Sequence, residues 1–415
     1  MSSSAIPDFF KKDRAERIRL VKEHAGLTEE EARLLDGGIS FAEADRMVEN
    51  AIGTFALPLG IATNFAVNGR DVLVPMVIEE PSVVAAASRA AKAARIHGGF
   101  TAKATDPLVP GQIQVLGADM GRAAEGIRAA SREILDTANA CSSTLSKMGR
   151  GAREVTTREV GTDTGPMLLI ELLVDVGDAM GANVVNSMCE AVAPVIERAT
   201  GGEAVLRILS NYTTQRLARA SAVFDGSMAG GPGIVGKMIS AYQLARYDVY
   251  RAVTHNKGVM NGCIAVSGAT GQDSRAIEAA AHAYAARSGR YTSLTEWSQD
   301  SQGNLVGSLE MPLSVGTVGG VTAVHPLARL CIKMTGASSA GELACVIVSA
   351  GLAQNFAALR ALSAEGIQKG HMRLHARNVA AAAGATPDQI DGIAAKMAEE
   401  GDISPRRARE LLDGP

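Results

Sequence analysis

The chain has 415 residues, more than a single hydrophobic core usually supports, so two or three domains are expected. Hydrophobic residues make up 47% and charged residues 20%, which is typical of a packed globular protein and excludes global disorder. Lys and Arg total 41 against 44 Asp and Glu, a net charge of -3 that argues against nucleic acid or an anionic membrane as the main partner.

The cysteines and the N-terminal segment favour a soluble cytoplasmic protein. The five cysteines are odd in number, scattered and without a C-x-x-C pair, so neither a disulfide framework nor a cysteine-based zinc site is indicated. Segment 1–24 mixes both charge signs and lacks the apolar stretch of a signal peptide. No run reaches the roughly 18 apolar residues of a membrane span. We therefore expect a cytoplasmic location, no membrane partner and no nucleic-acid partner.

The first hundred residues are predicted to form helices joined by loops. Segment 28–38, TEEEARLLDGG, has a threonine N-cap and a glycine stop, and segment 41–53 continues with helical periodicity. The alanine-rich segment 82–97 is predicted to be a strong helix, with Pro81 in its first turn and two glycines at 98–99 ending it.

A β-α-β-β-α-β order is predicted for the next hundred residues. A short strand at 112–117 precedes a long helix in which Ile127, Ile134 and Ala138 share one face. Two extended runs, a helix and a last strand follow at 152–160, 167–176, 182–200 and 203–212. This order is the ferredoxin-like arrangement, so the fold class is mixed α/β (α+β), with a small domain inserted into a large helix-rich domain.

The remainder is predicted to be helix-rich with strand interruptions such as 304–315, followed by a helical C-terminal segment. The predicted division is a first part of the large domain, the small domain, the second part of the large domain and the C-terminal segment, at 1–108, 109–212, 213–365 and 366–415.

Two helix starts are candidate sites for charged groups. Glu79 and Glu80 precede helix 82–97, where a carboxylate either caps the helix or, if desolvated, gains a raised pKa and serves as an acid. Segment 174–191 combines a strand, a glycine turn and a helix start, which offers free backbone N–H groups to an anion or is only a tight turn. It lacks the G-x-G-x-x-G pattern, so a Rossmann site is not expected.

Two further segments carry candidate catalytic side chains. Lys257 and Asp273 lie in the apolar stretch 254–286, where the lysine is either a side chain with its head in water or a fixed cation that stabilises an oxyanion. His371 and His375 share a helix face at i and i+4. No HExxH form or third ligand accompanies them, so no metal is expected and either imidazole can act as a proton donor.

Five motifs in a fixed order resemble the class II (bacterial) 3-hydroxy-3-methylglutaryl-coenzyme A reductases. The resemblance covers the chain from about residue 10 to the C-terminus. The motifs are ENAIG, VPMVIEEPSVVAAAS, DAMGANVVN, THNKGVMNG with ATGQD, and GHMRLHARN.

The resemblance implies a role for each matching residue. Glu80, Lys257 and Asp273 match the catalytic carboxyl groups and lysine, and His371 matches the histidine that protonates the coenzyme A thiolate. Contacts to the hydroxymethylglutaryl group are implied for Ser82, Arg251 and Asn261, and further active-site positions for Glu49, Asn211 and Gln354. The nicotinamide cofactor turn would comprise Asp178, Ala179, Met180, Gly181, Ala182 and Asn183. The resemblance further implies a cofactor-binding small domain, a mobile C-terminal flap that delivers His371, and a homodimer with sites at the subunit interface, and it leaves assembly beyond the dimer open.

The implied reaction explains the residue types. Reducing the thioester of hydroxymethylglutaryl-coenzyme A to mevalonate takes two hydrides and passes through a hemithioacetal and mevaldehyde, with negative charge on the former carbonyl oxygen each time. Lys257 would stabilise that charge, and Asp273 would keep the lysine charged and raise the pKa of Glu80. Members that prefer NADH are expected to carry an acidic residue in segment 139–151, and its absence here leaves NADH or NADPH open.

Two other classes of function remain open at this stage. A lysine Schiff base would make the protein an aldolase or lyase that acts on a coenzyme A ester. A non-catalytic protein that binds coenzyme A or a nucleotide is the other alternative.

Overall fold

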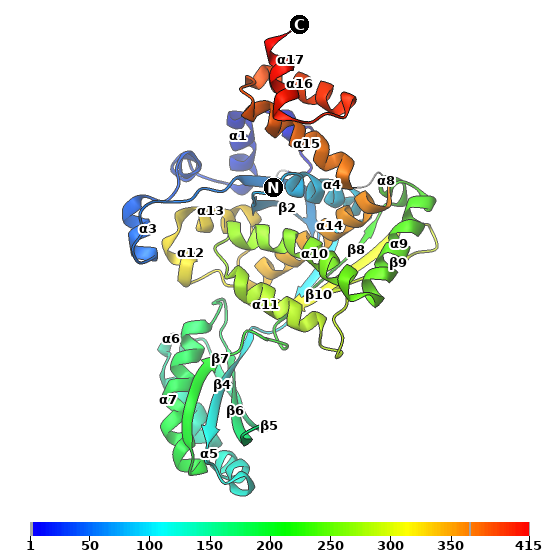
Figure 1. The fold of residues 1–415 in the computed structure, drawn as a ribbon. Coiled ribbons are helices and arrows are strands. Elements are labelled where there is room, and N and C mark those ends of the chain that lie inside the picture. Colours follow the sequence, from blue (N-terminus) through cyan, green and yellow to red (C-terminus); the bar gives the residue numbers. More distant parts are fainter. Residues whose placement is uncertain (1–2, 365–366, 415) are drawn as a thin grey trace.

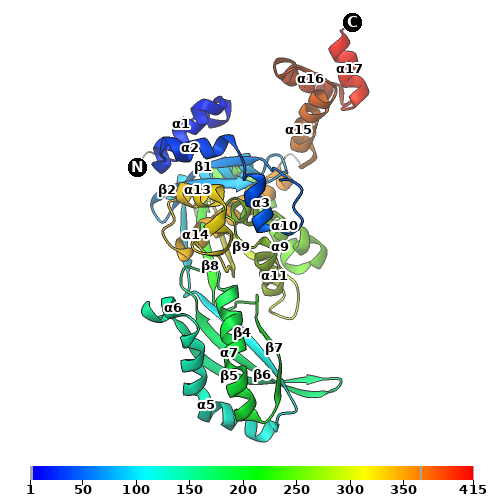
Figure 2. The same ribbon diagram turned by 90° about the vertical axis from the view of Figure 1, so that its left-hand side faces the viewer.

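The chain forms a large body with a smaller sheet-and-helix unit projecting from one end and a group of helices at the other (Figure 1). The computed structural model describes residues 3–364 and 367–414, and the side chains of residues 367–374 lie outside that description. A view turned by 90° shows the same three parts in a row, with the N-terminal helices beside the large body (Figure 2).

A six-stranded sheet forms the centre of the large body, in the order β2-β1-β3-β8-β10-β9. Neighbouring strands are antiparallel except β1 and β3, which pair in parallel where Val67 meets Phe100. The strands are β1 (Leu59–Val67), β2 (Arg70–Val77), β3 (Phe100–Ala104), β8 (Leu217–Phe224), β9 (Thr295–Gln299) and β10 (Leu305–Pro312).

Helix α14 (Ala340–Ser363) runs through the core of the large body. Its Phe356 stacks on Phe224 of the sheet with the ring centroids 4.2 Å apart. Among the described residues it is the one helix long and apolar enough to cross a membrane, but 83% of its most apolar window is buried inside the protein, so a core position explains its composition. The other helices of this half are α8 (Gly226–Ala229), α9 (Pro232–Tyr247), α10 (Val249–Ala269), α11 (Ser274–Ala285), α12 (Gly320–Val324) and α13 (Pro326–Thr335).

The N-terminal region contains short helices with the predicted caps, but one of them ends early. Thr28 and Glu31 form the reciprocal capping box expected from the sequence. The prediction of a helix over 41–53 is wrong after Met47, because Val48 is extended and Asn50 is left-handed (φ 57°). The elements are η1 (Phe9–Lys11), α1 (Arg14–Ala25), α2 (Glu29–Arg33), η2 (Leu34–Asp36) and α3 (Phe41–Met47).

Helix α4 (Val83–Arg95) starts in an unusual backbone conformation. Its N-cap residue, Ser82, has φ 77°, a left-handed value that is costly for a residue other than glycine. This turn leaves Pro81 outside the helix, so its predicted place in the first turn is wrong. The helix ends before the two glycines at 98–99, as the sequence predicts. At Gly99 (φ 85°) a Cβ would lie 2.3 Å from the carbonyl oxygen of Ala66, so glycine is required there.

The small unit has the predicted ferredoxin-like topology. Its strands lie in the order β5-β6-β4-β7, all antiparallel, and α5 and α7 pack on one face of the sheet. Ile127, Ile134 and Ala138 are buried between helix and sheet, which confirms the predicted face. The elements are β4 (Leu108–Leu116), α5 (Met120–Ala140), α6 (Ser143–Lys147), β5 (Gly151–Thr162), β6 (Gly165–Asp175), α7 (Ala182–Thr200) and β7 (Glu203–Leu209).

Three helices at the C-terminus share a small apolar cluster of their own. They are α15 (Ile367–Ala382), α16 (Pro387–Glu400) and α17 (Pro405–Asp413). Because the small unit and this cluster each bury separate apolar side chains, we propose that 109–212 and 366–415 are domains distinct from the large domain at 1–108 and 213–365.

One polar cluster ties the N-terminus to the sheet and to α4. The Asp71 Oδ1 atom accepts 2.7 Å hydrogen bonds from the Ser4 backbone N, the Ser4 hydroxyl and the Arg95 guanidinium. Burial would raise the pKa of Asp71, but these donors outweigh it and lower the pKa to about 2. The ionised carboxylate is therefore favoured in the folded state.

We expect Asp71→Asn to lower the free energy of unfolding by about 2 kcal/mol near neutral pH. Because the folded pKa lies below the unfolded value of about 3.9, this stabilisation is complete above that value and is lost as the pH falls toward about 2. Urea unfolding, followed by the fluorescence of the single tryptophan, Trp297, at pH 7 and pH 3 measures it. Asp45→Asn, at an exposed position, is the control. An unchanged midpoint for Asp71→Asn at pH 7 would contradict the expectation.

Candidate active site

Glu80 and Lys257, which lie far apart in sequence, meet in space. The Lys257 Nζ atom lies 2.8 Å from Glu80 Oε2, and the Asn261 Nδ2 atom donates to the same oxygen at 3.3 Å. Glu80 sits between β2 and α4, whereas Lys257 and Asn261 lie one turn apart on α10 and therefore share a face. Both groups donate to Oε2, so a proton on the carboxyl group would be carried by Oε1.

Glycines on both helices, Gly262 on α10 and Gly351 on α14, allow the two helices to approach each other closely. A Cβ at Gly262 would lie 2.5 Å from the carbonyl oxygen of Ala350, and one at Gly351 would lie 2.5 Å from the Cys263 Sγ atom. Both positions therefore need glycine. The low charge of this stretch follows from its position, because one side of α10 is packed in the core while Lys257 projects from the other.

A buried polar network fixes the turn of α10 that carries Lys257. The His255 Nε2 atom lies 2.7 Å from the Thr295 hydroxyl, which donates to Asn355 Oδ1 at 3.0 Å. The Asn256 side chain accepts from the Leu294 backbone N at 2.9 Å. Burial, with a smaller contribution from the charge of Arg251, lowers the pKa of His255 to about 3, so its imidazole is neutral at physiological pH. No local pattern in the sequence indicates this network, although His255 stands two residues before Lys257.

Asp273 caps the helix that follows α10. Its Oδ1 atom accepts from the backbone N atoms of Arg275 and Ala276 at 3.0 and 3.1 Å and lies 3.2 Å from the Arg275 guanidinium. Among the described hydrogen bonds and ion pairs, none joins Asp273 to Lys257 or Glu80. The helix N-terminus therefore orients the carboxylate and leaves Oδ2 available to another group.

The other predicted substrate residues are distributed unevenly around this centre. Arg251 lies half-buried on α10, where burial lowers the pKa of its guanidinium. Gln354 is buried against α10, and its Oε1 atom lacks a hydrogen-bond partner among the described residues. Glu49 and Asn211 are exposed, on the segment after α3 and on the connection after β7. Ser82 is the left-handed residue at the start of α4, and the side chain of His371 lies outside the described residues.

The predicted cofactor turn, 178–183, connects β6 to the N-terminus of α7. Gly181 adopts φ 107°, and a Cβ there would lie 2.8 Å from Val176. The Asp178 Oδ1 atom accepts from the Ala340 backbone N at 2.8 Å. The start of α7 presents backbone N–H groups that lack intrahelical partners, and a glycine lets an anion approach them closely. The residues present therefore fit the diphosphate of a dinucleotide.

An unpredicted carboxylate engages two of the basic residues near this turn. Asp175 lies 2.8 Å from the Arg150 guanidinium and 2.9 Å from that of Arg153. Burial would raise the pKa of Asp175, but the two arginines outweigh it and lower the pKa. Lys147, a third basic residue of this region, lies exposed at the end of α6, whereas Arg150 and Arg153 are both paired with Asp175.

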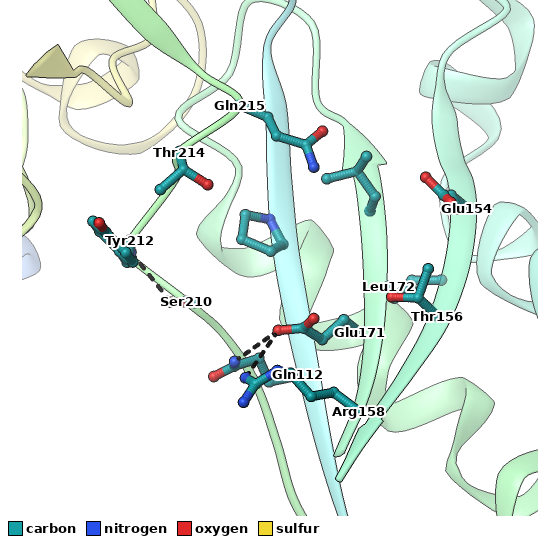
Figure 3. Close-up of a pocket in the computed structure, with 12 residues that line it drawn as sticks. Gln112, Glu154, Thr156, Arg158, Glu171, Leu172, Ser210, Tyr212, Thr214 and Gln215 are labelled. Carbon is teal, nitrogen blue, oxygen red and sulfur yellow. Dashed lines mark hydrogen bonds and ion pairs between the residues drawn. The ribbon is translucent and has the colours of Figure 1, made fainter. Parts of the chain in front are cut away.

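Two hollows lie away from the Glu80–Lys257 pair. A cavity of about 380 Å³ on the open face of the small sheet is lined by polar side chains, with Glu171 accepting from Gln112 and Arg158 at 3.3 and 3.4 Å (Figure 3). An apolar groove of about 1080 Å³ lies between the N-terminal helices, β1 and α13, and segment 53–57 forms part of its wall.

Comparisons with known proteins identify relatives along almost the whole chain. A sequence model of the family described as hydroxymethylglutaryl-coenzyme A reductase matches residues 13–376. The chain is 52% identical over 413 residues to the 3-hydroxy-3-methylglutaryl-coenzyme A reductase of Archaeoglobus fulgidus, covering 99% of this chain and 94% of that one. A probable enzyme of the same name from Borreliella burgdorferi is 36% identical over 346 residues, covering 80% and 77%.

Solved structures agree with these relatives. The reductase from Streptococcus pneumoniae superposes with a TM-score of 0.84 at 39% identity, covering 98% of this chain and 99% of that one. A class II reductase from the same organism, bound to NADPH in open conformations, gives a TM-score of 0.82 at 40% identity, with 97% and 99% covered. These matches confirm the predicted family and fold class.

Proposed function

Since the chain belongs to the hydroxymethylglutaryl-coenzyme A reductase family and is a nicotinamide-dependent oxidoreductase, we propose that Glu80, Lys257 and Asn261 form its catalytic centre. The observation that carries this proposal is the 2.8 Å pair between Lys257 Nζ and Glu80 Oε2, which joins two of the motifs. The substrate is hydroxymethylglutaryl-coenzyme A, of which coenzyme A is a part, and the product is mevalonate.

The geometry suits two successive reductions at one carbonyl carbon. The nicotinamide, when bound, supplies the hydride for each step. Lys257 stabilises the negative charge that develops on the former carbonyl oxygen, and Glu80 delivers a proton to that oxygen from Oε1. The hemithioacetal then loses the coenzyme A thiolate while its hydroxyl proton returns to Glu80, which gives mevaldehyde and a protonated carboxyl group for the second reduction. Asp273, held by the start of α11, contributes a further carboxylate to this centre.

The remaining assignments follow from position and from the family resemblance. We place Ser82, Arg251 and Gln354 around the hydroxymethylglutaryl group, with Glu49 and Asn211 at the edge of the site. His371 protonates the departing thiolate from the C-terminal flap, a role that rests on its motif. The cofactor turn receives the dinucleotide, and the carboxylate-free segment 139–151 accepts NADH or NADPH. Four of the five free cysteines are buried, which suits a reducing cytoplasm.

A homodimer would cover the exposed apolar segment that follows α3. Ile52 and Phe55 are 100% and 91% exposed, and this segment borders the apolar groove. Isolated apolar side chains on a surface are ordinary, but a contiguous run beside an apolar groove marks an interface. Glu49 lies in the same segment, so association would bring it to a subunit boundary.

We expect Phe55→Asp to shift the protein from dimer to monomer, because a carboxylate cannot be buried without a partner. Sedimentation velocity at micromolar concentration measures the change. Val205→Asp, at an exposed apolar position on β7, is the matched control and should leave the dimer intact. A dimer that survives Phe55→Asp together with Ile52→Asp would show that this segment is not the interface.

The overall function is tested by the absorbance at 340 nm with hydroxymethylglutaryl-coenzyme A and either nicotinamide. Michaelis constants for NADH and NADPH, measured side by side, give the preference. No absorbance change with either cofactor would reject reductase activity and favour a protein that only binds coenzyme A or a nucleotide. Trapping of substrate on Lys257 by borohydride would favour the aldolase or lyase class.

A further inference from the structure

Segment 315–318, between β10 and α12, lies directly against the cofactor turn. The Thr317 backbone N donates to the Asp178 carbonyl oxygen at 2.9 Å, and Ala179 forms an isolated parallel bridge with Val318. A Cβ at Gly316 would lie 2.5 Å from the backbone N of Met180. Backbone therefore packs on backbone here, with no side chain between the two segments to absorb a displacement.

The same segment is also bound by Gln272, which lies in the loop between α10 and α11 that carries Asp273. The Gln272 Oε1 atom accepts from the Gly316 backbone N at 2.8 Å, and Gln272 Nε2 donates to the Gly316 carbonyl oxygen at 3.0 Å. The same Nε2 donates to the Thr270 carbonyl oxygen at 2.7 Å. Gln272 precedes Asp273, so a shift of Gly316 moves the catalytic carboxylate as well.

Arg216, the residue just before β8, bonds to both the cofactor turn and segment 315–318. Its Nη1 atom donates to the Met180 carbonyl oxygen at 3.0 Å, and Nη2 donates to those of Ala179 (3.1 Å) and Val315. The residue is only 4% exposed, and no hydrogen bond or ion pair to a carboxylate is found for it in the described parts of the chain. Burial lowers the pKa of Arg216 to about 10, against opposing effects of Asp178 and Asp175, so it stays cationic at neutral pH.

Burying a cation costs free energy, and the Arg216 guanidinium offsets this cost by donating hydrogen bonds to backbone carbonyl oxygens. The cost is offset only if these hydrogen bonds keep good geometry. The planar guanidinium donates in a fixed fork to three carbonyl groups on two segments, which a lysine ammonium cannot reproduce. One of these segments is the cofactor turn. The other, 315–318, is bonded in turn to Gln272 in the loop that carries Asp273.

We propose that Arg216 and Gln272 are positioning residues that fix the cofactor turn against the Asp273 loop through segment 315–318. This inference rests on the proposed roles of the turn and of Asp273. Their contacts set the spacing between the hydride donor and the groups that handle charge and protons at the carbonyl. A displacement of about 1 Å between reacting groups costs on the order of 100-fold in rate.

Arg216→Lys and Gln272→Met test the proposal, with Arg219→Lys on the exposed face of β8 and Gln299→Met on β9 as matched controls. We measure kcat, the KM for each substrate, the melting temperature and the primary isotope effect with cofactor deuterated at the transferred position. We expect kcat to fall by about 10- to 100-fold, the KM for cofactor to rise and the isotope effect to increase, because hydride transfer becomes rate-limiting. The KM for hydroxymethylglutaryl-coenzyme A should stay within about twofold of wild type.

A purely structural role gives a different result. If the melting temperature falls while kcat, the cofactor KM and the isotope effect of the folded protein match wild type, the proposal is overturned. If Arg216→Lys does not fold, Gln272→Met decides by the same criteria, since it removes only the two bonds to Gly316 and the bond to Thr270. An inactive wild-type enzyme would reject the proposed function, whereas an active wild type with unaffected variants rejects only this inference.

Discussion

Replacing Lys257 with alanine should abolish both reductive steps while leaving the binding of the coenzyme A ester largely intact. The ammonium group is the cation that contacts Glu80, and Asn261, the other donor to Glu80 Oε2, is neutral. Losing one preorganised donor to a developing oxyanion typically costs 100- to 1,000-fold, and a charged donor contributes more, so we expect about 1,000-fold or greater loss of kcat. The absorbance at 340 nm, with the thioester and with free mevaldehyde as separate substrates, measures each step.

Lys237→Ala is the matched control, because Lys237 is an exposed lysine on the neighbouring helix α9. It should keep wild-type rates with both substrates. If Lys257→Ala reduces mevaldehyde at nearly the wild-type rate, Lys257 does not stabilise the oxyanion in the second step. A Kd for the coenzyme A ester that rises as steeply as kcat falls would indicate a role in binding instead.

Local signals in the sequence predicted much of the fold. Thr28 with Glu31, and the glycine turn before α7, are short-range features whose chemistry is complete within a few residues. Helix α7 has the predicted bounds, 182–200, and the strand and helix order identified the small unit. The end of α3 at Met47 was not predictable, because the apolar period of the sequence continues while the backbone turns at Val48 and Asn50.

The site depends on contacts that sequence spacing does not reveal. Glu80 and Lys257 are 177 positions apart, and only the packing of α10 against β2 and α14 brings them together. Arg216 reaches Val315 across 99 positions, and no sequence pattern around it distinguishes it from the exposed Arg219 of the following strand, β8. The motifs indicated candidate site residues, whereas the ion pairs of Asp175 and the hydrogen bonds of Arg216 and Gln272 to segment 315–318 could be seen only in the fold. The roles of all these site residues, Glu80 and Lys257 included, remain predictions.

Replacing Glu80 with glutamine tests whether this carboxyl group is the proton donor of the catalytic centre. Glu80→Gln preserves the volume and an acceptor oxygen but removes the carboxyl group that can release a proton to the substrate oxygen and then be left charged opposite Lys257. General acid catalysis typically contributes 100- to 10,000-fold, so we expect about 1,000-fold loss of kcat with both the thioester and mevaldehyde. The KM for hydroxymethylglutaryl-coenzyme A should change little, because the lost interaction is made in the transition state. Stopped-flow reduction in a single turnover isolates the chemical step.

Two comparison variants determine what a loss at Glu80 means. Glu79→Gln alters the adjacent, exposed carboxylate and should remain close to wild type, since no partner ties Glu79 to the centre among the described hydrogen bonds and ion pairs. Asn261→Ala removes one neutral donor, at 3.3 Å, and should cost only about tenfold. Equal losses for Asn261→Ala and Glu80→Gln would indicate that the carboxyl group serves to order α10 and not to donate a proton. A larger loss for Glu79→Gln than for Glu80→Gln would indicate that Glu79 is the general acid. The two carboxyl groups are adjacent in sequence, but of the two only Glu80 contacts Lys257 among the described ion pairs.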